Sequence, residues 1–240
     1  MKKIVLLLIV LISFHNLSAQ ETFTRKDSLQ GGLRPERTCF DVQRYDLNIK
    51  VNIDKKSIVG YNDITLKVIN NTSKIQIDLF DNMQVDSIVY NFKKLDYKRE
   101  YNAVFISFPT DLLKGTSEKL RFYYSGNPII AKQAPWDNGF VFSIDKQNKP
   151  WVGITSQGTG ASLWWPCKDS QSDEPDNGMT IKVAVPDGLM NVSNGKFIGS
   201  ENVNNGYTRW DWEVANPINT YCVTINIADY AHIHDDLNGL

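Results

Sequence analysis

The stretch Tyr45–Val68, YDLNIKVNIDKKSIVGYNDITLKV, alternates apolar and polar residues in two runs. In the first run, every second position is apolar from Tyr45 to Ile53, and the pattern resumes at Ile64, Leu66 and Val68. Successive side chains of a β-strand point to opposite faces of its sheet, so this period predicts strands with one buried face. The polar residues 54–57 between the runs predict a turn, and the whole stretch therefore predicts a β-hairpin.

The same period of two recurs along most of the chain, and no segment shows the long apolar stripe of an amphipathic helix. Asn204-Asn205-Gly206, between two such segments, suits the positive φ angles of a tight hairpin loop. These patterns predict an all-β fold of sandwich-like antiparallel sheets. The further strand segments are Ile75–Leu79, Val104–Phe108, Leu120–Tyr124, Ile181–Val185, Thr208–Val214 and Tyr221–Ile227.

The amino-terminus has the order of a secretory signal peptide, with Lys2 and Lys3 before an apolar run over 4–12 and small residues ending at Ala19. A membrane anchor is the competing interpretation, but the apolar run is about half of the ~20 residues that a spanning helix needs. We therefore predict a signal peptide over 1–19, cleavage after Ala19, export to the periplasm, cell surface or medium, and no transmembrane segment afterwards.

Three further segments follow in the predicted organisation. Residues 20–38 are polar with glycines and predict a flexible or loosely packed lead-in. Residues 39–231 form the β-domain. Residues 232–240 lack a closing element, so they are interpreted as a truncated edge or the start of a linker, with an ordinary frayed terminus as the alternative.

Charge and cysteine content exclude several classes of protein. The formal charge is −1 for the whole chain and −3 without Lys2 and Lys3, and no basic run is present, so nucleic acid is not expected as a partner. Cys39, Cys167 and Cys222 lie far apart and form no C-x-x-C pair, so no zinc knuckle or disulfide framework is expected. Free buried thiols are the simplest interpretation, while an oxidising compartment permits one disulfide of undefined pairing.

No residue pattern indicates catalysis or metal binding by this chain alone. His232 and His234 do not form an H-E-x-x-H pattern, and a solvated strand end is the expected place for them. Ser162 lacks the G-x-S-x-G context of a nucleophile elbow, so a Ser-His-Asp triad is rejected. The glycines of Gln157–Gly160 do not follow a βαβ strand and are not a phosphate loop.

The segment around these glycines, Ile154–Asp176, combines ITSQGTG with two tryptophans and several carboxylates. Trp164 and Trp165 are large enough for a sugar-stacking platform, but neighbouring strand residues face opposite ways, so at most one could join such a platform and at least one is expected in the core. The carboxylates match no standard calcium loop and are expected to be solvated turn residues. They are Asp169, Asp173, Glu174 and Asp176.

Three blocks of sequence, in order, resemble the amino-terminal domain of zinc aminopeptidases of the aminopeptidase N family. The first is Cys39–Leu66, with a Tyr-Asp-Leu strand and a glycine before a second strand. The second is Gln157–Pro175, which contains Trp-Pro-Cys-Lys-Asp and Glu-Pro, and the third is Trp210–Asp229. The resemblance covers about residues 39–231, but Ser162 and Leu163 stand where many members carry arginine, and the step at 170–172 is longer than usual.

The resemblance implies a saddle-like β-domain that precedes a thermolysin-like catalytic domain and lends one loop to its active-site wall. In the family, a Gln or Glu twelve residues before the aspartate matching Asp169 contacts the free amino group of the substrate. Gln157 has that spacing, so Gln157 and the adjacent Gly158 are the expected substrate-binding residues, with the peptide amino-terminus as partner. A side-chain carbonyl accepts hydrogen bonds from an ammonium group.

The resemblance places the zinc ligands of the complete enzyme, including H-E-x-x-H, after residue 240. This chain is therefore expected to hold no cofactor and to be inactive alone, and to pack against the catalytic domain through an exposed apolar surface near Gln157 or the last strands. An exported carbohydrate- or peptide-binding β-sandwich without catalysis is the alternative. An H-E-x-x-H after Leu240 in the gene favours the enzyme, and a stop codon there favours the binding module.

Overall fold

The structure, a computed structural model, describes residues 22–233. The predicted signal peptide and His234 lie outside the described residues. Within 22–233, no helix has both the length and the apolar character needed to cross a membrane.

Strands dominate the described chain, as the alternating pattern predicted, and an all-β fold is confirmed. The helical segments are α2 (Arg25–Gly31), α3 (Pro35–Thr38), η1 (Ala161–Leu163) and η2 (Thr220–Cys222). The strands are β1 (Phe40–Asn52), β2 (Ser57–Val68), β3 (Thr72–Asp78), β4 (Met83–Tyr90), β5 (Lys93–Lys94), β6 (Asp96–Glu100), β7 (Ala103–Leu112), β8 (Ser117–Gly126), β9 (Gly139–Ile144), β10 (Pro150–Thr155), β11 (Met179–Pro186), β12 (Met190–Ser193), β13 (Lys196–Asn202), β14 (Tyr207–Val214) and β15 (Ile225–Ala228).

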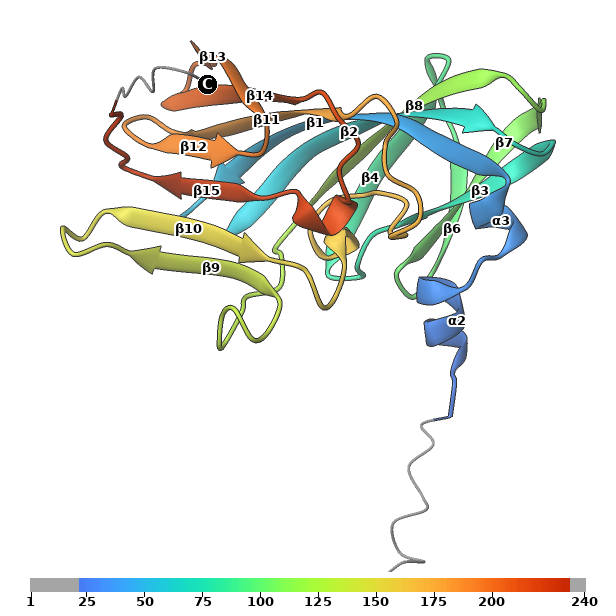
Figure 1. The fold of residues 1–240 in the computed structure, drawn as a ribbon, viewed down its shortest axis with the longest axis horizontal. Helices are drawn as coiled ribbons and strands as arrows, with labels where there is room; N and C mark the ends of the chain where they lie inside the picture. Colours follow the sequence, from blue (N-terminus) through green and yellow to red (C-terminus); the bar gives the residue numbers. More distant parts are fainter. Residues whose placement is uncertain (1–21, 234–240) are drawn as a thin grey trace, which may run out of the picture.

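The strands form three sheets around one core (Figure 1). An eight-stranded sheet has the order β13-β14-β11-β1-β2-β8-β4-β5 and extends along the length of the molecule. A four-stranded sheet, β12-β15-β10-β9, lies against one part of it, and a three-stranded sheet, β3-β7-β6, lies towards the other end. The pairing of β1 with β11 is parallel, so the large sheet is not purely antiparallel as the sequence had predicted.

The hairpin predicted at Tyr45–Val68 is present as β1 and β2, which pair in antiparallel register from Phe40 opposite Val68 to Asn52 opposite Ser57. Its inward side chains are fully buried, including those of Leu47 and Val51. Burying such side chains contributes about 1.5–3 kcal/mol each to the hydrophobic free energy of folding. The period-two pattern therefore identified the centre of the large sheet.

The hairpin between β13 and β14 is closed by the predicted turn. Asn204, Asn205 and Gly206 all have positive φ angles, of 69°, 55° and 77°. The register of β13 against β14 shifts between Phe197 and Gly199, which marks a β-bulge in this edge strand of the large sheet.

The lead-in was predicted at 20–38 from its polar composition as a loosely packed segment, and its described part, residues 22–38, differs from this. Thr24 and Asp27 form a capping box at the start of α2, in which each side chain accepts the other's backbone N–H. Leu29 and Arg37 are both 2% exposed. One apolar side chain and one buried guanidinium thus hold the two short helices against the β-domain.

The last predicted strand is shorter than its alternating pattern. Tyr221 lies in η2, and only Ile225–Ala228 forms β15. The backbone carbonyl of Tyr221 accepts a hydrogen bond from the Ser156 hydroxyl at 2.9 Å. In an extended strand, the Tyr221 carbonyl would accept a hydrogen bond from a neighbouring strand. Here it accepts one from the side chain of Ser156, which lies in a loop that is distant in sequence.

Candidate functional site

The segment Ile154–Asp176 links the surface to the core. It leaves the end of β10, forms a partly exposed loop over 156–160, enters the core through η1 and continues towards β11. Gln157 and Gly158 lie in the exposed part of this loop. Gln157 therefore lies on a short surface loop, and the segment that begins with η1 anchors this loop in the core.

Both tryptophans of the segment are anchors in the core. Trp164 and Trp165 are 0% exposed, and their rings pack edge to face against Phe140 and Tyr45, with centroid distances of 6.0 and 5.0 Å. The expectation of at least one tryptophan in the core is confirmed, and both lie there because the pair follows the turn of η1 and does not lie in a strand with alternating faces.

Asp169 connects the loop to the lead-in and to β3. Its carboxylate accepts hydrogen bonds from the Ser162 backbone N–H at 3.0 Å and hydroxyl at 2.6 Å. Its own N–H donates to the Asp78 carboxylate at 3.0 Å, and Asp78 forms a buried ion pair with Arg37. Arg37 also donates to the backbone carbonyls of Asp169 and Gln30, each at 3.1 Å.

Burial raises the pKa of Asp78 to about 6, and the charge of Arg37 together with a hydrogen bond from Gln76 opposes this shift. The group is therefore ionised at neutral pH and paired with the guanidinium. We call Arg37, Asp78 and Asp169 the buried brace. Because Gln30 also donates to the carbonyl of Thr159 at 3.3 Å, helix α2 contacts the loop directly as well as through the brace.

The carboxylates of this segment divide into two groups. Glu174 and Asp176 are exposed, as expected of solvated turn residues. Asp173 is 7% exposed and forms an ion pair with buried Lys168, so the expectation of a solvated position is wrong for this residue, and Asp169 is held in the buried brace. Asp173 also accepts the Val42 N–H at 3.1 Å, which joins the segment to β1.

Gly160 closes the loop at a position that only glycine suits. Its φ is +101°, and an added Cβ would lie 2.2 Å from the Asp169 Oδ2 atom. Its N–H donates to the Ser156 carbonyl at 2.8 Å. Close approach of the backbone to Asp169 thus gives the turn between Gln157 and the core its shape.

A groove of about 680 Å³ lies beside Gln157 and Gly158. The end of β10, the loop before β9 and the segment 221–224 form its walls. The Gly158 N–H donates to the Asn138 side-chain oxygen at 3.1 Å, which holds the two loops together. Gln157 is therefore at the surface of a formed recess, where its amide is available to a ligand.

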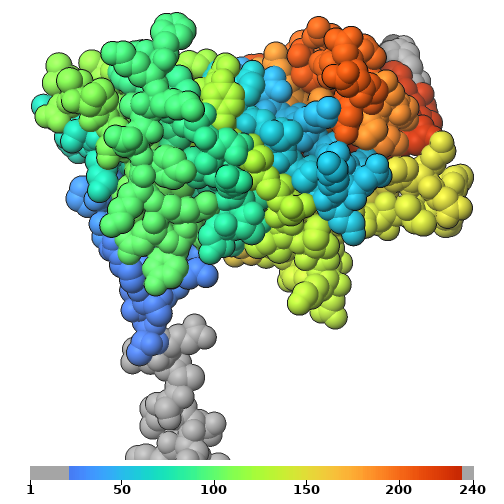
Figure 2. Space-filling view, turned by 180° about the vertical axis from the view of Figure 1, so that it is seen from behind, coloured from blue at the N-terminus to red at the C-terminus, as the bar shows by residue number. Residues whose placement is uncertain are grey.

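The loop over 134–139 is a part of this site that the sequence did not connect to Gln157. It precedes β9 and projects from the body of the molecule (Figures 1 and 2). Its tip, Trp136, is 87% exposed and lines the groove. The available sequence signal for this loop was its tryptophan between a proline and Asp-Asn-Gly. That pattern does not place the loop beside residue 157, because only the fold brings the two together.

The cysteines are all free thiols. Cys39 and Cys167 are buried, and burial raises the pKa of both. Cys222 is exposed and lines the Gln157 groove, which departs from the expectation of buried thiols. Within residues 22–233, no group of three or more His, Cys, Asp or Glu side chains is arranged to hold a metal ion.

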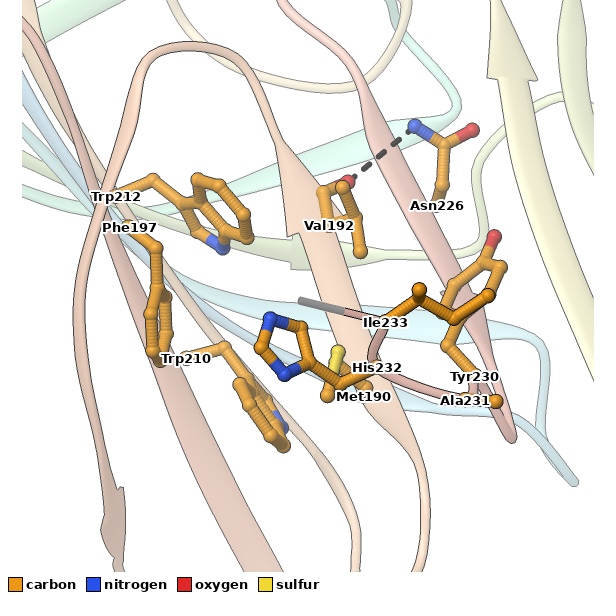
Figure 3. A pocket seen from close by; sticks show the side chains of 10 residues that line it. All are labelled: Met190, Val192, Phe197, Trp210, Trp212, Asn226, Tyr230, Ala231, His232 and Ile233. Carbon is orange, nitrogen blue, oxygen red and sulfur yellow. Dashed lines mark hydrogen bonds between the residues drawn. The ribbon is translucent and has the colours of Figure 1, made fainter. Parts of the chain in front are cut away.

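A second, apolar groove of about 770 Å³ lies between the edges of the two larger sheets (Figure 3). Phe197 packs against Trp210 and Trp212, with ring centroids 5.8 and 5.2 Å apart, and His232 lies opposite them. Figure 3 also shows Ile233 near the end of the described chain, and this residue is 84% exposed. An exposed apolar surface is thus present at the last strands, one of the two places where it was expected.

Solved structures with this fold include zinc peptidases. An M1 zinc metallopeptidase from Deinococcus radiodurans aligns with a TM-score of 0.68 and 23% identity over 79% of this chain and 42% of the other. An E323A mutant of that enzyme bound to a Tyr-Ser-Ala substrate gives 0.67 and 22% over the same shares. Yeast LTA4 hydrolase gives 0.60 and 20% over 80% of this chain and 29% of its own. The chain thus spans less than half the length of each.

None of the curated protein sequences matches this chain. A family model described as the peptidase M1 N-terminal domain matches residues 42–222, which include most of β1, the Gln157 loop and η2. The match covers most of the chain and agrees with the three sequence blocks and the fold. The chain belongs to the peptidase M1 N-terminal domain family.

Proposed function

We propose that this chain is the amino-terminal domain of an exported zinc aminopeptidase, in which the Gln157 loop recognises the free amino-terminus of a peptide. The observation that carries the proposal is the exposed Gln157 at the rim of a groove, on a loop fixed by the buried brace and by Asn138. An amide oxygen held in this way accepts a hydrogen bond from an ammonium group without reorganisation of the loop.

We infer that the zinc ligands of the complete enzyme lie outside residues 22–233, within which no group of three or more His, Cys, Asp or Glu side chains is arranged to hold a metal ion. Zinc, when bound elsewhere in the complete enzyme, would supply a Lewis acid and an activated water. The contribution of the chain is to bind and orient the substrate end and to pack against the catalytic domain. The basic start of the sequence and its apolar run support export.

The test is Gln157→Ala in the full-length enzyme, assayed on matched peptides with free and N-acetylated amino-termini. A hydrogen bond to a charged group contributes about 1.5–3 kcal/mol, so we expect kcat/KM for free amines to fall roughly 10- to 100-fold. The zinc content and the melting temperature are expected to stay unchanged, because the side chain is exposed.

Gln147→Ala is the matched control, since Gln147 is an exposed glutamine in the turn between β9 and β10. It is expected to leave kcat/KM unchanged. If Gln157→Ala cleaves free-amine peptides at the parent's rate, Gln157 does not bind the substrate. If the full-length protein cleaves no peptide at all, the proposed function is wrong.

A further inference from the structure

The turn between β4 and β5 places a bulky side chain where the backbone favours glycine. Asn91 and Phe92 form this two-residue turn, because Tyr90 pairs with Lys93, and their φ angles are positive, at 47° and 63°. Such turns favour Asn followed by Gly, since a bulky side chain strains a backbone with positive φ. Phe92 is also fully exposed, so packing within the described chain does not offset this strain. An aromatic side chain at this position therefore points to a contact outside the chain.

Two other turns lie beside this one, where β2 ends and β8 begins (Figure 1). The Lys114 backbone N–H donates to the Asn71 side chain at 2.7 Å, which joins the turn before β8 to the turn after β2. The hydroxyls of Tyr90 and Thr116 donate to the Glu118 carboxylate at 2.6 and 2.7 Å, which brings the β4–β5 hairpin to the same place. Figures 1 and 2 show the green part of the chain projecting at the end of the molecule opposite β9 and β10.

The segments 69–71, 91–94 and 113–117 of these turns contain three lysines and no acidic residue. All three lysines are exposed, and none of them forms an ion pair among the residues that the structure describes. The nearest exposed acids in sequence, Asp96 and Asp111, lie on β6 and β7. The three segments therefore form a basic surface at this end of the molecule.

Exposed apolar side chains stand among these lysines. Phe92 is fully exposed, and Leu113 and Ile69 are 58% and 38% exposed. Each of them stands on a separate turn, so a fluid lipid bilayer, which yields around each side chain, suits them better than a rigid protein face. Lysines beside apolar side chains bind anionic headgroups, while the apolar groups enter the boundary with the acyl chains. We call these residues the lysine tip surface: Ile69, Phe92, Lys93, Lys94, Leu113 and Lys114.

We propose that the lysine tip surface docks the protein on an anionic lipid bilayer, with Phe92 and Leu113 among the headgroups and the lysines beside the lipid phosphates. This docking does not depend on the proposed function, since it uses no residue of the Gln157 groove. It leaves that groove open, because β9 and β10 lie at the opposite end of the molecule (Figure 1).

Sedimentation of the full-length protein with lipid vesicles tests the proposal. We expect binding to vesicles of phosphatidylcholine mixed with phosphatidylglycerol and little binding to phosphatidylcholine alone, because the lysines need anionic headgroups. High ionic strength should weaken the binding, since salt screens charges at a surface. Absence of binding to the mixed vesicles, or equal affinity for both kinds, would overturn the proposal.

Phe92→Gly separates membrane contact from folding. The variant should bind the mixed vesicles on the order of tenfold more weakly, since it lacks the side chain that the bilayer would remove from water. Its melting temperature should not fall, because glycine suits the positive φ of this turn. Phe23→Gly, at a phenylalanine that is 77% exposed in the lead-in, is the control and should bind like the parent. Equal affinity of Phe92→Gly and the parent would overturn the insertion of this side chain.

Lys93→Ser combined with Lys94→Ser tests the charges. The affinity for the mixed vesicles should fall about fivefold for each lysine removed. The matched control is the pair Lys55→Ser and Lys56→Ser, at two exposed lysines in the turn between β1 and β2, at the other end of β2. This control pair should leave the affinity unchanged, and an equal loss for both pairs would show that the lysine tip surface is not the site of docking.

A soluble polyanion distinguishes the bilayer from other anionic partners. Retention on immobilised heparin should depend on the lysines and not on Phe92, whereas binding to vesicles should depend on both. Retention on heparin without binding to vesicles would assign the surface to a soluble polyanion and overturn the proposal. None of these measurements requires peptide cleavage, so a protein without peptidase activity tests the docking equally well.

Discussion

The shape of the Gln157 loop depends on the absence of a side chain at Gly160. We expect Gly160→Ala to lower the free energy of unfolding by about 1–3 kcal/mol, since the methyl group meets the Asp169 carboxylate in addition to the cost of a positive φ. Urea denaturation of the purified chain measures this loss. The control is Gly115→Ala, where φ is +89° and no atom lies within 4 Å, so only the backbone cost is expected.

An equal loss for both glycine variants would show that the contact with Asp169 contributes nothing. A larger loss for Gly160 would support the close approach of the loop to Asp169 as a determinant of its geometry.

Asp78 provides a residue-scale prediction for pH. Its pKa is about 6 in the folded chain, above the ordinary value of 3.8, so between about pH 4 and pH 6 the folded state keeps a proton that the unfolded state releases. This group therefore makes the free energy of unfolding fall as pH rises through that window. The destabilisation caused by Asp78→Asn should be larger at pH 4.5 than at pH 7.

Urea denaturation of both proteins at the two pH values measures that difference. A penalty that shrinks towards acid pH would instead mean that Arg37 holds the pKa of Asp78 below its ordinary value.

At the scale of elements, Arg37 is one of the buried side chains that join the lead-in helices α2 and α3 to the β-domain. Arg37→Met should lower the free energy of unfolding by about 3–5 kcal/mol, because it leaves the Asp78 charge buried without a partner. Adding Asp78→Asn should restore part of this loss. Thermal and urea unfolding of the single and double variants form the double-mutant cycle.

Arg25→Met is the control, since the ion pair of Arg25 with Glu100 is at the surface, and it is expected to change stability little. If the double variant were as unstable as the sum of the single variants, the two side chains would not act as a pair.

The elements differ in how far the sequence predicted them. Strands β1, β2, β8 and β11 have apolar alternation because one of their faces lies in the core. Helix α2 gave no such signal, since a single apolar residue, Leu29, is buried and the remaining contacts are polar. The structure of residues 221–224 was missed because Ser156, 65 residues earlier, takes the Tyr221 carbonyl.

At the scale of the whole molecule, the fold brings together two loops that the sequence separates. The family resemblance identified Gln157 by its spacing to Asp169. The structure adds the groove and Trp136 beside it. No local pattern specifies that neighbourhood, because it depends on the pairing of β9 with β10 and on the contact between Asn138 and Gly158. Long-range contacts of this kind arise only once the sheets are assembled.

The bulge in β13 has a consequence for the behaviour of the protein at high concentration. This strand is a free edge of the largest sheet, and such edges can template strands of other molecules into aggregates. The register shift between Phe197 and Gly199 interrupts the regular row of backbone donors and acceptors, and Lys196 and Glu201 place charges along the same edge. The irregular strand therefore opposes polymerisation through the sheet while leaving the pairing with β14 intact.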